Sequence, residues 1–173
     1  MNSPAHFVIG AAICRQTRSK PLGFVLALAS HFALDALPHL ESYGLFPQPL
    51  RSLVASYWSA LLLAAQLLLV PLVALAAWRL CKLGHAWPAV LYVVAGGLFA
   101  CVPDALSELV GSGTVIGRLN ESSHILWHEG LQLALLADPR WRPALLAIMV
   151  LTEAAVFAAG LWLVLRRDAR RED

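Results

Sequence analysis

Charged side chains are scarce in this chain of 173 residues. Asp, Glu, Lys and Arg make up 14% of the sequence, whereas a soluble domain averages ~25%. Hydrophobic residues make up 59%, above the ~45–50% of soluble domains, and the mean hydropathy is +0.67. This composition predicts an integral membrane protein with one domain, residues 1–173, and the lipid bilayer as its main partner. The net charge of +2 is too small to predict a nucleic-acid partner.

Cysteine is also rare, and its number excludes two common scaffolds. The three cysteines are Cys14, Cys81 and Cys101, and an odd number at wide spacing builds neither a disulfide framework nor a zinc ribbon. Each lies in or beside an apolar run, so we interpret them as buried packing residues. The chain also lacks a secretory signal, because "MNSPAHFVIG" has no positive start and no small-residue cleavage pattern.

Long apolar runs dominate what is present. A membrane-spanning helix needs about 20 apolar residues, and four runs approach or exceed this length. Two shorter runs indicate an N-terminal half-span and a helix at the membrane surface. The sequence therefore predicts an all-α, polytopic membrane helix bundle with about four transmembrane helices. The expected spans are 21–37, 53–78, 87–102 and 144–165, the half-span is 4–14, and the interfacial helix is 124–136.

Lysine and arginine gather in three segments. They are "RQTRSK" (15–20), "WRLCK" (78–82) and the C-terminal "RRDARRED" (166–173). Alternation of the spans places all three on one side, which the positive-inside rule assigns to the cytoplasm. We therefore expect a cytoplasmic C-terminus.

Polar residues interrupt the apolar runs at "SHFALDALPH", residues 30–39. His31 and Asp35 are four residues apart, so they share a helix face. Pro38 disfavours continuation of the helix, so we expect His39 to lie just beyond its end.

Other ionisable residues reach the same membrane depth. His6 lies nine residues before Arg15, and His31 lies ten residues after Pro21, so a helical hairpin would place both histidines about 13–15 Å into the membrane. Carboxylates inside a bilayer are costly and usually functional. The remaining candidates are Asp104 and Glu108 at the end of the third span, His124 and His128 in the outer segment, and Glu153 within the last span.

Histidine and carboxylate groups of this kind suit a divalent metal. Zinc fits the nitrogen and oxygen ligands best, and manganese or iron fit them too. We expect the ligands among seven residues, with Glu153 or Glu108 as the general base. Each residue also has a structural interpretation, such as a hydrogen-bonded His–Asp pair, a turn residue or a buried carboxylate. The seven are His6, His31, Asp35, His39, Asp104, His124 and His128.

His6, "SHFALDALPH" and "VPDALSE" together resemble the small bacterial membrane-bound metal-dependent hydrolases. More distantly, the chain is similar to the zinc-dependent phospholipases C. The resemblance implies a multi-pass protein of the bacterial inner (plasma) membrane. The ligands that it implies are His6, His31, Asp35, Asp104 and His128.

Three functions follow as hypotheses. The first is a membrane-embedded metal-dependent hydrolase that acts near the outer face, on a lipid or lipid-linked phosphoester. The second is a proton- or metal-coupled transporter component, in which buried acids and histidines relay ions. The third is a non-catalytic membrane bundle or interaction protein, whose polar cluster stabilises the helices.

Overall fold

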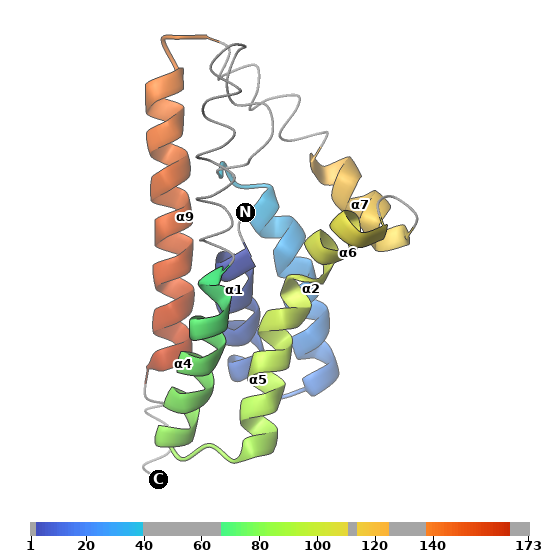
Figure 1. The fold of residues 1–173 in the computed structure, drawn as a ribbon, viewed down its shortest axis with the longest axis vertical. Helices are drawn as coiled ribbons and strands as arrows, with labels where there is room; N and C mark the ends of the chain where they lie inside the picture. The colour runs from blue at the N-terminus through green and yellow to red at the C-terminus, as the bar shows by residue number, and fades with distance from the viewer. Residues whose placement is uncertain (1–2, 40–66, 111–113, 125–137, 167–173) are drawn as a thin grey trace.

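The computed structural model describes residues 3–39, 67–110, 114–124 and 138–166, and this part of the chain is helical without strands. The expectation of an all-α protein is therefore confirmed. Five helices lie alongside one another, and a shorter pair, α6 and α7, lies to one side (Figure 1). The helices are α1 (Ser3–Gln16), α2 (Lys20–Asp35), α4 (Leu69–Lys82), α5 (Trp87–Ala100), α6 (Val102–Val110), α7 (Val115–His124) and α9 (Arg142–Leu165).

Helix α1 is the centre of the bundle. It packs against α5, α9, α2 and α4, and its side chains are buried almost all round. A helix that is apolar on every face is expected to be surrounded in this way. The central position matters for the site, because α1 carries His6.

Small residues let α1 and α5 approach closely. A Cβ atom on Gly10 would lie 2.6 Å from Cβ of Ala100 and 2.7 Å from the carbonyl oxygen of Gly96. Close backbone contact of this kind is typical of helix pairs in membranes, where small residues form the interface.

Gly10→Ala is therefore expected to destabilise the protein. The new methyl group meets backbone that cannot rotate away, and overpacking of this kind costs about 1–3 kcal/mol. The melting temperature in detergent should fall by about 3–10 °C for a chain of this length. Ala95→Val is the control, because Ala95 is exposed on α5 and its change should be within about 0.5 kcal/mol. Equal melting temperatures for the two variants would contradict the close packing.

The basic residues of the described chain gather mainly at one end of the bundle. Helices α1, α4 and α9 end there, and α2 begins there (Figure 1). The residues at this basic end are Arg15, Arg18, Lys20, Arg79, Lys82 and Arg166. The segments 15–20 and 78–82, which the sequence predicted to share one side, thus lie together.

Among the described helices, one is long and apolar enough to cross a membrane, namely α9, Arg142–Leu165, with 24 residues. Helices α2, α4 and α5 have 16, 14 and 14 residues, shorter than the ~20 residues of a full span. Part of the second expected span, residues 53–66, lies outside the described residues. The structure thus establishes the helix bundle, and the number of membrane spans stays a prediction.

The segment between α5 and α9 was harder to foresee. The expected interfacial helix, 124–136, falls almost entirely outside the described residues, whereas α7 was not expected. Thr114 starts α7, since its Oγ1 accepts a hydrogen bond from the backbone N–H of Gly117 at 2.9 Å. Just before α9, Arg140 donates to Asp138 through its side chain and its backbone N–H, and these bonds lower the pKa of that carboxyl.

Candidate metal centre

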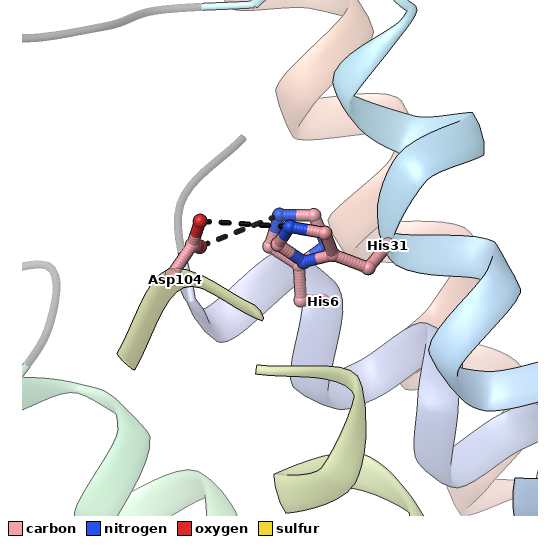
Figure 2. Close-up of side chains that lie close together, drawn as sticks. All are labelled: His6, His31 and Asp104. Atoms are coloured by element: carbon pink, nitrogen blue, oxygen red, sulfur yellow. Dashed lines mark ion pairs between the residues drawn. The ribbon is translucent and has the colours of Figure 1, made fainter. Parts of the chain in front are cut away.

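Four ionisable side chains meet where α1 and α6 begin and α2 ends. His6 comes from α1, His31 and Asp35 from α2, and Asp104 from α6. The two imidazole rings stack, with their centroids 4.2 Å apart and their planes inclined by 30°. Figure 2 shows the carboxylate of Asp104 facing the edges of both rings.

The two carboxylates approach the same two nitrogen atoms. Asp35 places Oδ1 3.1 Å from Nε2 of His6, and Oδ2 3.0 Å from Nε2 of His31. Asp104 places Oδ2 3.8 Å from Nε2 of His6, and Oδ1 3.5 Å from Nε2 of His31 (Figure 2). Each Nε2 atom thus faces two acidic groups.

The backbone fixes the tautomer of His31. Its Nδ1 lies 3.0 Å from the carbonyl oxygen of Ala100, which can only accept a hydrogen bond, so Nδ1 carries a hydrogen. In a neutral ring, Nε2 then holds a lone pair. That lone pair points at carboxylate oxygens, which also carry lone pairs. A cation between these atoms, either a proton or a metal ion, is needed to make the arrangement favourable.

His6 supplies a second indication. Its side chain is 0% exposed, and among the described residues neither of its ring nitrogens has a hydrogen-bond partner. The 3.1 Å approach of Asp35 is therefore short without having the direction of a hydrogen bond. Two ligands of a shared cation have this relationship, because both direct lone pairs at a point between them.

The spacing fits a metal ion. Bonds of ~2.0–2.2 Å in a tetrahedral site put neighbouring ligand atoms ~3.3 Å apart, and the contacts above run from 3.0 to 3.8 Å. One ligand atom each from His6, His31 and Asp104 lies within 4.8 Å of the others. Asp35 approaches both histidines more closely still. The two imidazoles and one carboxylate of that group suit zinc, and also manganese or iron.

The cluster is closed on most sides. His6 and His31 are 0% exposed and Asp35 is 2% exposed, while Asp104 is 26% exposed. Because α1 and α6 begin and α2 and α5 end at the cluster, it faces away from the basic end of the bundle (Figure 1). Asp104 is therefore on the open side of the site.

His39 lies beside the cluster. It is 0% exposed, and its Nε2 is 3.9 Å from Oδ1 of Asp35. Its Nδ1 donates to the carbonyl oxygen of Leu37 at 2.8 Å, just after α2 ends at Asp35. As expected from Pro38, His39 lies beyond the helix end, and it contacts the cluster through Asp35.

Of the other expected residues, Glu153 is the one whose side chain the structure describes. Glu153 is buried on the side of α9 that carries Met149, Gly160 and Val164, and this side faces α1, since Gly160 packs on Val8. The side chains of Glu108 and His124, and the whole of His128, lie outside the described residues. Their expected roles as base or ligands stay predictions.

Sequence reasoning missed two participants. The carbonyl group of Ala100 orients His31, and Pro103 lies in the first turn of α6, just after the break between α5 and α6. The proline was visible in "VPDALSE" as a helix-breaking residue. Nothing in the sequence showed which side chain the freed carbonyl would meet.

Comparison of the chain with protein-family models, with curated proteins and with solved structures finds no match. What the cluster does must therefore be argued from its chemistry.

Proposed function

We propose that this protein is an integral membrane, metal-dependent hydrolase that cleaves a phosphoester. His6, His31 and Asp104 are its metal ligands in this proposal, with Asp35 beside them, so that a fourth coordination position remains for water. The observation that carries it is the convergence of two buried Nε2 atoms and two carboxylates at ligand spacing.

A metal held by these residues would supply a hydroxide at neutral pH by lowering the pKa of bound water to ~7, and would polarise a phosphoryl oxygen. The protein's own contribution is geometric. The Ala100 carbonyl fixes the ring of His31, because a hydrogen bond to one ring nitrogen orients the other toward a metal. The burial of His6, His31 and Asp35 excludes bulk water, and the partial exposure of Asp104 leaves one side for a substrate.

Membrane insertion is supported by the surface of the bundle. Trp141 and Trp162 are each 60% exposed and lie 21 residues apart, about 31 Å along a helix. This matches the ~30 Å hydrocarbon core of a bilayer, at whose edges tryptophan is enriched. Exposed apolar side chains also cover α2, α4, α5 and α9. Examples are Val25, Val70, Leu91 and Leu151.

The orientation of the site favours a lipid or lipid-linked substrate. In the positive-inside arrangement, the basic end faces the cytoplasm, and the cluster then opens toward the outer face. His31 follows Lys20 by 11 residues, about 16 Å of helix, which is about halfway across a hydrocarbon core of ~30 Å, so a head group would have to enter the bundle through its open side to reach the metal. Glu153 is proposed as the general base from α9, with Glu108 as the alternative.

Metal analysis and hydrolysis tests on the detergent-purified protein examine this proposal. We expect at least one zinc, manganese or iron ion per chain, and hydrolysis of bis-p-nitrophenyl phosphate or of phosphatidylglycerol vesicles. A chelator should remove both properties, and the metal should restore them. His85→Ala is the control, since His85 follows α4 near the basic end, and it should keep its metal. A folded wild-type protein that binds no metal under these conditions would contradict the proposal. Proton or metal flux in liposomes without hydrolysis would favour a transporter instead.

A further inference from the structure

Helices α5 and α6 are separated by a single residue, Cys101. Pro103 causes this break, because it has no N–H group and its ring clashes with the carbonyl four residues before it. The N–H of Cys101 bonds to the carbonyl of Leu98 at 3.0 Å and tightens the last turn of α5. The next backbone bond, from Ala105 N–H to Cys101 O at 3.2 Å, belongs to the new helix.

The break makes the Ala100 carbonyl available to a side chain. The last carbonyls of a helix lack partners within that helix, and that of Ala100 accepts the Nδ1–H of His31 at 3.0 Å. In an uninterrupted helix this carbonyl would accept the N–H of residue 104. The orientation of the His31 ring thus depends on where α5 ends.

The same break positions the second carboxylate. Asp104 lies in the first turn of α6, and its oxygens lie 3.5 Å from Nε2 of His31 and 3.8 Å from Nε2 of His6. Pro103 itself is buried, with less than 2% of its surface exposed. One interruption of the helix therefore places two groups around His31, the carbonyl behind the ring and the carboxylate in front of it.

We propose that Pro103 is a positioning residue of the metal centre: by ending α5 at Ala100, it holds both the Ala100 carbonyl and the Asp104 carboxylate against His31. This inference rests on the proposed metal site. If it is correct, replacing Pro103 with alanine lowers the metal affinity without lowering the stability of the fold. The stability is kept because alanine allows α5 to continue and restores a backbone hydrogen bond.

Pro103→Ala in the full chain tests the inference, with Zn²⁺ affinity measured by competition with a chelator. We expect a ~10–100-fold loss of affinity, the effect typical of removing an outer-shell partner of a metal ligand. The melting temperature of the metal-free variant should equal or exceed that of the wild type. Pro88→Ala is the matched control, because Pro88 lies in the first turn of α5, at the far end from the site, and its Zn²⁺ affinity should match the wild type. Unchanged Zn²⁺ affinity in Pro103→Ala would overturn the inference. A lower Zn²⁺ affinity together with a lower melting temperature of the metal-free variant would overturn it too.

A second measurement needs no metal. At about pH 8, the ¹⁵N chemical shifts of the His31 ring report which of its nitrogens carry a hydrogen. We expect the Nδ1–H tautomer in the wild type and a mixture of tautomers in Pro103→Ala. A pure Nδ1–H tautomer in both proteins overturns the positioning role. If the wild type binds no zinc but the His31 tautomers differ between the wild type and Pro103→Ala, the proposed function fails and the positioning of the His31 ring by Pro103 is supported.

Discussion

Replacing His31 with alanine is expected to abolish the stabilisation of this protein by zinc while leaving its helices formed. The wild type should gain about 2.7 kcal/mol of unfolding free energy at a free zinc concentration of 100 times Kd. For a chain of this length, that corresponds to a rise in melting temperature of about 5–10 °C. The variant should show no rise, because it lacks one of the two buried nitrogen ligands that face Asp35 and Asp104.

The loss of affinity in this variant should exceed the ~10–100-fold that follows removal of an outer-shell partner. Circular dichroism and thermal unfolding with and without zinc measure the two effects. His31→Gln guards against a folding defect, because its amide keeps a donor near the Ala100 carbonyl but offers no imidazole. A zinc-dependent rise of wild-type size in both variants would remove His31 from the ligands. His85→Ala should retain the full rise.

Arg15→Gln is expected to cause the largest loss of stability away from the site. The guanidinium group of Arg15, on α1, donates to three carbonyls at the end of α9. They are Leu163 at 3.0 Å, Val164, and Arg166 at 2.6 Å. Terminal carbonyls of a helix have no partners within it, and a cation there also complements the helix dipole. Arg79 adds a longer bond from α4 to Leu165, at 3.4 Å.

Hydrogen bonds to charged groups contribute about 1.5–3 kcal/mol each, and glutamine cannot reach three carbonyls. We therefore expect Arg15→Gln to lower the unfolding free energy by at least ~3 kcal/mol, and the melting temperature by at least ~6 °C. Arg140→Gln is the control, because Arg140 is 86% exposed and pairs with Asp138 next to it. An exposed pair contributes ~0–1 kcal/mol. Similar melting temperatures for the two variants would show that the α1–α9 connection is not stabilising.

Much of the His–Asp cluster could be anticipated from counting along the sequence. Equal distances from the turn at 16–20 put His6 and His31 at one level, and the structure stacks their rings. The i, i+4 spacing of His31 and Asp35 placed both on one face, and Pro38 ended the helix before His39. These inferences worked because they depend on helix rise and periodicity alone, which the local sequence determines.

Contacts between helices could not be predicted by counting along the sequence, because the sequence does not show which helix packs against which face. Arg15 was interpreted only as a marker of the cytoplasmic side, whereas its guanidinium contacts α9. The central position of α1 depends on close contacts at Gly10 and Gly97, and a lone glycine in an apolar run does not show what it will meet. Helix α7 was missed because its composition is polar and its apolar pattern is short.

The contact between Arg15 and Arg166 joins positions 151 residues apart. It can therefore form only late in the translation of residues 1–173. His6, His31, Asp35 and Asp104 all emerge from the ribosome before α9, so their cluster can assemble while translation continues. One side of the central helix must stay uncovered during that time. Translation of α9 then supplies the missing wall and the carbonyls that Arg15 binds, and the bundle is complete only after α9 has been made.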